Sequence, residues 1–175
     1  MKRSLGFTLI ELLVVLGILG ILAAGLLAAI DPFEQLKKGR DTNLRNTVIE
    51  LLNGFTRFYA THGELPWCDA GTCSTFTTPT ELSDTTFWDE NTGYLQKLIN
   101  DGELKTEFRT GLGTGNAARI YATSSDPTEI IICFQPDSKA LRNDGTVQYD
   151  ADGTVNAVKD CDTAGTTNGC YWCAR

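Results

Sequence analysis

The chain has 175 residues, a formal net charge of −7 at pH 7 and a single histidine, His62. This length fits one domain together with a membrane anchor. The acidic balance argues against a general nucleic-acid binder, which needs a basic patch. A hydrolase of the Ser-His-Asp or Cys-His type would have to use His62, and no nucleophile motif accompanies it. We therefore expect a protein that is not an enzyme.

The N-terminal stretch has the composition of a membrane span. Lys2 and Arg3 precede an apolar run over residues 7–30, in which Glu11 is the one ionisable side chain. As a helix this run reaches roughly 36 Å, enough for a bilayer core of about 30 Å. The basic pair predicts a cytoplasmic N-terminus and an exported remainder. A carboxylate inside such a helix costs roughly 2.5–3.5 kcal/mol, so Glu11 is expected to be functional and to have a partner.

The order of Gly6, Phe7, Thr8 and Glu11 before the apolar run resembles the N-terminus of a bacterial type IV prepilin or pseudopilin. The resemblance implies that a membrane prepilin peptidase cleaves after Gly6 and methylates Phe7. It implies that Glu11 neutralises the N-terminus of a neighbouring subunit during filament assembly. Small residues at positions 23–25 and 28–29 keep an ordinary signal peptide or simple anchor as an alternative.

The same resemblance implies a set of partners and a location. The partners are other copies of the chain in a homopolymeric filament, the peptidase, an inner-membrane assembly platform and an assembly ATPase. The precursor is expected as a single-pass protein of the inner (cytoplasmic) membrane. The mature chain is expected in an extracellular filament at the cell surface.

Residues 31–62 form an amphipathic pattern. Asp31 is a good N-cap and Pro32 suits the first helical position, so a restart or a kink is expected within one helix over residues 8–60. Gly63, with Pro66 beyond it, is expected to end that helix, and the resemblance to pilins extends to about this point. The side chains expected on one apolar face are Phe33, Leu36, Leu44, Val48, Leu51, Leu52, Phe55 and Tyr59, and the charged residues, Asp41 among them, are expected on the rest.

The remaining chain is expected to form a small domain that contains both helices and strands. Residues 67–89 are expected as an irregular connection, 91–100 as a short helix and 111–115 as a flexible glycine-rich loop. Alternation at 118–123 and a continuous β-branched run at 129–135 predict an antiparallel hairpin. A second hairpin is expected over 146–149 and 154–157, and a last strand over 170–174.

These elements predict an α+β fold of the pilin-like kind, in which a long N-terminal helix, apolar and then amphipathic, packs on a small C-terminal antiparallel sheet. The expected division is a leader at 1–6, a transmembrane and polymerisation helix at 7–30, the amphipathic half of the helix at 31–62, and an exported disulfide-bonded domain at 63–175.

All six cysteines follow the apolar run, which suits disulfides in an oxidising compartment. Zinc bound by Cys68, Cys73, Cys170 and Cys173 is the alternative. Cys170 and Cys173 on one strand would be about 10 Å apart, too far to bridge each other. The pairing that we favour joins Cys68 to Cys73, Cys133 to Cys173 and Cys161 to Cys170.

Asp150 and Asp152, followed by Gly153, look like the start of a calcium loop. An EF-hand loop that starts at Asp150 would need Glu at its twelfth position, where this chain has Cys161. Some pseudopilins bind calcium in a C-terminal loop, so Asp150 and Asp152 stay weak candidates, with Asp144, Asp160 and Asp162 as further oxygen donors. Otherwise no cofactor or metal is expected.

The function expected first is that of a structural subunit of a type IV pilus-like filament, assembled through its N-terminal helix after cleavage and methylation. A minor pseudopilin of a type II secretion system is an alternative. An alternative of another class is a monomeric, membrane-anchored exported binding module that uses its Cys or Asp clusters for a metal or ligand.

Overall fold

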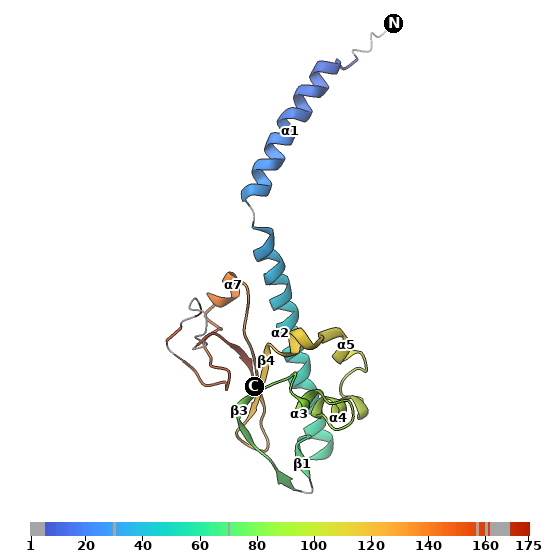
Figure 1. The fold of residues 1–175 in the computed structure, drawn as a ribbon, viewed down its shortest axis with the longest axis vertical. Helices are drawn as coiled ribbons and strands as arrows, with labels where there is room; N and C mark the ends of the chain where they lie inside the picture. Colours follow the sequence, from blue (N-terminus) through green and yellow to red (C-terminus); the bar gives the residue numbers. More distant parts are fainter. Residues whose placement is uncertain (1–5, 30, 70, 157, 160, 162–168) are drawn as a thin grey trace. The chain divides into compact units, whose positions relative to one another are not determined.

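The computed structural model of the chain describes residues 6–29, 31–69, 71–156, 158–159, 161 and 169–175 (Figure 1). It divides into two compact units, Met1–Leu36 and Lys37–Arg175. An apolar helix dominates the first unit, and the second holds most of the next helix together with a small antiparallel sheet. The predicted α+β class is confirmed.

Helix α1, Leu9–Ala29, is the predicted apolar span. Leu9–Leu27 is long and apolar enough to cross a membrane, and none of its side chains is buried. At 1.5 Å per residue this stretch measures roughly 28 Å, close to the thickness of a bilayer core. Its side chains therefore need an apolar surrounding that the helix itself does not supply.

Helix α2, Pro32–His62, starts afresh after α1. The Asp31 carboxylate accepts hydrogen bonds from the amides of Phe33 (3.0 Å) and Glu34 (3.3 Å), as an N-cap does, and Pro32 occupies the first helical position. The predicted restart at Asp31 and Pro32 is therefore confirmed, and it divides the helix expected over residues 8–60 into α1 and α2. At the other end, Gly63 adopts a φ of 73° and its amide donates to the Tyr59 carbonyl at 2.8 Å. The predicted C-terminal end is confirmed.

The predicted apolar face of α2 is confirmed over its middle and C-terminal turns, where Leu44, Val48, Leu51 and Phe55 are buried together with Phe58. Phe33 and Leu36 were expected on the same face, but they are 73% and 66% exposed. Apolar spacing alone cannot tell a helical turn that has a core beside it from one that does not.

Asp41 corrects the sequence-based assignment of the polar face, because this side chain is only 1% exposed. Its carboxylate accepts hydrogen bonds from the amides of Asp137 (3.0 Å) and Ser138 (2.7 Å) and from Arg119 Nη2 at 3.3 Å. Ser138 in turn caps helix α7, Lys139–Arg142. Asp41 therefore joins α2 to the segment that follows strand β5, Ile131–Phe134. It does so by accepting from backbone amides that would otherwise have no hydrogen-bond partner inside the protein.

The sheet has four antiparallel strands in the order β3-β4-β5-β6, with bounds Phe76–Glu81, Ile120–Ser124, Ile131–Phe134 and Trp172–Ala174. The predicted hairpin is confirmed as β4 and β5, in which Tyr121 pairs with Cys133. The predicted last strand is confirmed as β6, where Cys173 pairs with Cys133. The buried side chains of β4 and β5 join those of α2 and of helix α4, Tyr94–Asn100, in one core.

Strand β3 was missed, because residues 67–89 were expected to be irregular. Pro79 lies inside this strand and is tolerated because β3 is at an edge of the sheet, where one row of amides has no strand partner. The same stretch also holds β1, Cys68–Asp69, β2, Thr72–Cys73, and helix α3, Thr85–Trp88.

Three further expectations concern the short helix, the glycine-rich stretch and the second hairpin. The predicted short helix is confirmed as α4, Tyr94–Asn100. The glycine-rich stretch is not a loop but two short helices, α5, Phe108–Leu112, and α6, Thr114–Ala117, which Gly113 separates with a φ of 72°. The second hairpin is reduced to isolated bridges from Tyr149 to Val155 and to Tyr171; Ala157 lies outside the described residues.

Replacing Asp41 with Ala should lower the free energy of unfolding by about 3 kcal/mol, because it leaves the buried Ser138 amide and the half-buried Asp137 amide without their acceptor and removes one of the acceptors of Arg119. Denaturant unfolding of the full chain in detergent, followed by tryptophan fluorescence, measures this change. Glu50→Ala is the matched control on the exposed side of α2 and should stay within about 0.5 kcal/mol of wild type. Equal effects of the two substitutions would contradict the assignment.

Candidate functional site

The start of α1 holds the residues that the sequence singled out. Thr8 precedes the first helical residue, and Glu11 is the third residue of the helix. Glu11 Oε2 accepts hydrogen bonds from the Thr8 amide and from Thr8 Oγ1, both at 2.8 Å, and the Glu11 amide donates to Thr8 Oγ1 at 3.3 Å. These reciprocal bonds form a capping box, which satisfies donors that a helix N-terminus leaves open.

Glu11 therefore has a local partner that sequence reasoning missed. Thr followed three positions later by Glu before an apolar run is itself the signature of a capping box. The bonds engage one carboxylate oxygen, Oε2. Among the described residues no donor reaches Oε1, so the carboxylate keeps an acceptor for a group from outside the helix. The N-terminal end of the helix dipole also favours a negative charge in this first turn.

Gly6 and Phe7 lie in non-helical, exposed backbone directly before the cap, and the Phe7 side chain is 85% exposed. Nothing lies within 4 Å of a Cβ built at Gly6. The Gly6–Phe7 peptide bond is thus outside the helix and open to an enzyme, as cleavage there would require. Residues 1–5 of the expected leader lie outside the described residues.

The comparison with protein families bears on this same segment. Residues 1–27 match the family described as the prokaryotic N-terminal methylation motif. The chain begins with a class III leader of the type IV pilin and pseudopilin kind. Neither the search of curated proteins nor that of solved structures returned a match. The motif thus covers Gly6, Phe7, Glu11 and most of α1.

The six cysteines form three disulfides in the compact unit: Cys68–Cys73, Cys133–Cys173 and Cys161–Cys170. This is the pairing that the sequence analysis favoured. Cys133–Cys173 joins two residues that face each other across β5 and β6. Because every sulfur is engaged in a disulfide, no thiolate is left to bind the zinc ion of the alternative reading.

The two calcium candidates serve local turns. The Asp150 carboxylate accepts from Asn156 Nδ2 at 3.0 Å and from the Gly169 amide at 2.7 Å. Asp152 Oδ1 accepts from the amide (2.9 Å) and hydroxyl (2.7 Å) of Thr154. Within the described part of the chain, no three His, Cys, Asp or Glu side chains are grouped so that they could hold a metal ion. Asp160 and Asp162 lie outside that part.

Other acidic residues of the domain are used in the same way. Asp84, Asp126 and Asp144 each accept hydrogen bonds from the hydroxyl and the amide of the Thr two residues later. The hydroxyl and then the amide hold the pKa of each carboxyl below its ordinary value. These carboxylates stabilise turns and do not converge on a ligand site.

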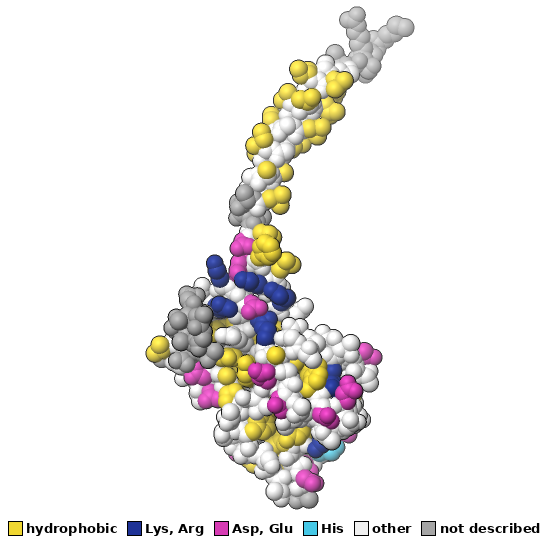
Figure 2. Space-filling view, viewed as in Figure 1, with side chains coloured by type: hydrophobic (Ala, Val, Ile, Leu, Met, Phe, Trp, Pro, Cys, Tyr) yellow, Lys and Arg dark blue, Asp and Glu magenta, His cyan; other side chains and the backbone are white. Residues whose placement is uncertain are grey.

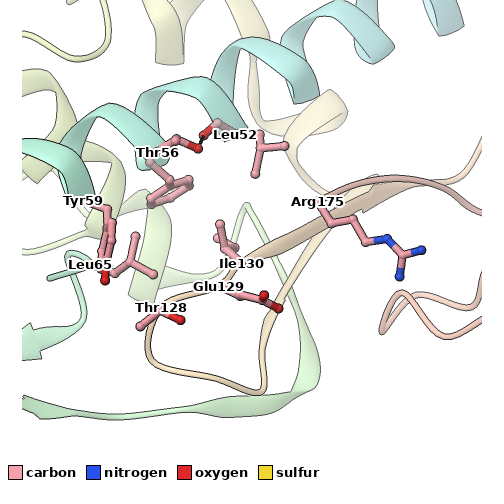
Figure 3. A pocket seen from close by; sticks show the side chains of 9 residues that line it. Leu52, Thr56, Tyr59, Leu65, Thr128, Glu129, Ile130 and Arg175 are labelled. Carbon is pink, nitrogen blue, oxygen red and sulfur yellow. Dashed lines mark hydrogen bonds between the residues drawn. The ribbon is translucent and has the colours of Figure 1, made fainter. Parts of the chain in front are cut away.

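One pocket of about 240 Å³ opens beside α2 (Figure 3). Its apolar lining includes Leu52, Leu65 and Ile130, and its ionisable groups include Glu129 and Arg175. Neither a histidine nor a cysteine lines it. The hydroxyl groups in its lining belong to Thr56, Tyr59 and Thr128.

Replacing Thr8 with Val should fray the start of α1, because the first-turn amides lose a cap worth about 1 kcal/mol. Hydrogen exchange of the full chain in detergent should become about fivefold faster at the Glu11 and Leu12 amides. Thr42→Val is the control, since Thr42 Oγ1 donates to the Lys38 carbonyl within α2 and its loss leaves α1 untouched. Unchanged exchange at Glu11 in Thr8→Val would contradict the capping role.

Proposed function

We propose that the protein is a structural subunit of a type IV pilus-like filament, released from its leader by cleavage between Gly6 and Phe7. The observation that carries the proposal is the placement of Glu11, capped by Thr8 at the start of an exposed apolar helix, four residues after Phe7. The methylation motif over residues 1–27 supports it.

Two properties of α1 support this proposal: its apolar surface and the single carboxylate of Glu11. Its apolar side chains are satisfied by lipid before assembly and by the same helix of other subunits afterwards, so the transfer exchanges one apolar surrounding for another. Glu11 is the exception, because in either surrounding its carboxylate needs a partner. Cleavage creates a cationic, methylated amine at Phe7, and the open Oε1 of Glu11 can accept its N–H in a neighbouring subunit.

Such a pair is strong only away from water. At an effective dielectric constant of 20, opposite charges 4 Å apart attract by about 4 kcal/mol, against about 1 kcal/mol in water. A subunit that enters the filament out of register would leave the amine and the carboxylate unpaired in an apolar surrounding. Glu11 would thereby fix the register of assembly as well as its strength.

In this proposal the chain carries out no reaction. The prepilin peptidase, the assembly ATPase and the membrane platform are separate proteins that act on it. A pseudopilin of a type II secretion system would use the same leader, helix and carboxylate. A long surface filament and a short secretion pseudopilus then differ in how many subunits are added, not in how each is added.

The processing step is tested by the mass of the mature protein. The chain is expressed with a prepilin peptidase, and the exported protein should begin at N-methylated Phe7. Gly6→Val is the matched variant, because open space surrounds the Cβ position and a loss of cleavage would then reflect recognition by the peptidase. A mature chain that begins at Met1 or within residues 24–30 would overturn the proposal in favour of an anchor or an ordinary signal peptide.

Substitutions can separate the role of the Glu11 charge from the role of its oxygen in the capping box. Glu11→Gln keeps an oxygen for the Thr8 bonds but removes the charge, whereas Glu11→Ala removes both. We expect both variants to insert into the membrane as wild type does and to yield at least roughly tenfold less sheared filament, since more than 1.4 kcal/mol of pairing is lost. Glu50→Gln on α2 is the control. A normal filament yield from Glu11→Gln would show that Glu11 acts only as a capping residue and that its charge is not needed for assembly.

A further inference from the structure

The compact unit carries its cations unevenly. Lys38 and Arg40 are exposed on the second and third turns of α2, Lys37 is half-buried beside them, and Lys139 is exposed at the start of α7. We call these four residues the basic collar. Figure 2 shows most of the visible Lys and Arg side chains gathered at this end of the unit, with a few Asp and Glu side chains beside them and others scattered over the rest of the visible face.

The contacts of Asp41 hold the two parts of the collar together. Its carboxylate binds the amides of Asp137 and Ser138, and α7 begins at the next residue, Lys139. The lysine of α7 is thus fixed to the turn of α2 that carries Lys38 and Arg40. The collar is therefore a surface built by the fold and not a run of sequence alone.

The acidic groups closest to the collar are largely engaged elsewhere. Asp41 is buried against Arg119, and Asp137 Oδ2 lies 3.2 Å from Arg119 Nη1. Asp31, which caps α2, and Glu34, in its first turn, are acidic neighbours that precede the collar, and Glu50 lines the same surface hollow as Arg40. The collar still gathers four cations on a chain whose formal charge is −7, which sets it apart from the rest of the surface.

Chain connectivity limits how far this positive surface can lie from the membrane. The apolar span ends at Leu27, and Lys37 follows ten residues later in the sequence. Even fully extended, that stretch covers at most roughly 35 Å, and a helical one about 15 Å. The head-group layer adds about 5–7 Å on each side of the bilayer core. Phe33 and Leu36 fall within this stretch of the sequence, and a membrane interface would accept their exposed apolar side chains.

We propose that the basic collar binds the anionic head groups of phospholipids on the exported face of the membrane in which α1 is anchored. The inference rests on the proposed function for that anchoring. Lysine ammonium groups attract phosphate as point charges, and the Arg40 guanidinium can bind two phosphate oxygens at once. The collar would then hold the folded domain down on the bilayer until the subunit is extracted into a filament.

Lipid is favoured over the acidic surface of a second copy. The anchor keeps the collar within reach of the bilayer throughout the life of the precursor, and an anionic bilayer presents a continuous negative plane. By contrast, the carboxylates of Asp84, Asp126 and Asp144 are scattered along the domain and are already engaged by turn hydrogen bonds.

The test uses the full-length chain in vesicles of phosphatidylcholine alone or mixed with phosphatidylglycerol. Flotation measures anchoring, and mass spectrometry after amine labelling measures access to Lys38. Labelling of Lys38 should fall roughly fivefold in the anionic vesicles, the ratio expected for one cation attracted to an anionic surface. The exposed Lys105 should label equally in both, and high salt should restore Lys38 labelling.

A charge-matched pair of variants completes the experiment. In K38Q/R40Q the labelling of Lys139 should lose its dependence on anionic lipid, whereas K105Q/R175Q, which removes two exposed cations outside the collar, should keep it. Failure to float in neutral vesicles would overturn the anchoring and the inference together. Flotation with equal Lys38 labelling in both vesicles would overturn the lipid assignment alone. Protection that depends on protein density in neutral vesicles would replace lipid with a second copy.

Discussion

The exposed apolar surface of α1 is the constraint on which the rest of the chain depends. Every side chain described over residues 9–27 is exposed, and burying one Leu, Ile or Val contributes about 1.5–3 kcal/mol. A helix with this many such residues cannot remain in water. It must lie among lipid tails or among other helices, and the chain that follows must fold without it. The compact unit Lys37–Arg175 meets that demand with its own core, built on the buried stripe of α2.

Within that constraint, the first turn of α1 is where a carboxylate is best tolerated. Its amides have no partners inside the helix, and the helix dipole favours a negative charge there. Glu11 occupies the third helical position, which lets one oxygen close the capping box with Thr8 while the other stays open. A carboxylate two turns further along would find neither free amides nor a neighbouring N-terminus. The same placement thus makes the acid tolerable in the precursor and, in the assembly that we propose, leaves an oxygen for a neighbouring subunit.

The sequence predicted the elements whose cause is local or periodic. Composition alone identified α1, spacing identified the stripe of α2, and a β-branched run identified β5. What it could not predict depends on partners far along the chain: Asp41 is buried because the amide of Asp137, 96 positions away, needs an acceptor. Strand β3 was missed because Pro79 is a breaker everywhere except at a sheet edge, and strand order is a tertiary property. The pairing of Thr8 with Glu11 could have been predicted, since its signal, Thr followed three positions later by Glu, is local.

The two helix caps explain how one chain can serve in two surroundings. Thr8 and Glu11 close the start of α1, and Asp31 separately closes the start of α2. Neither helix needs the other to satisfy its first amides, so α2 keeps its cap whether α1 lies in lipid or in a filament. Within the compact unit, Asp41 and the Cys133–Cys173 disulfide then join α2 to α7 and β5 to β6 through contacts that involve no residue of α1. If α1 moves from the membrane into a filament, as we propose, these contacts within the domain would not have to change, and the polar groups that would have to find new partners are Glu11 and the basic collar.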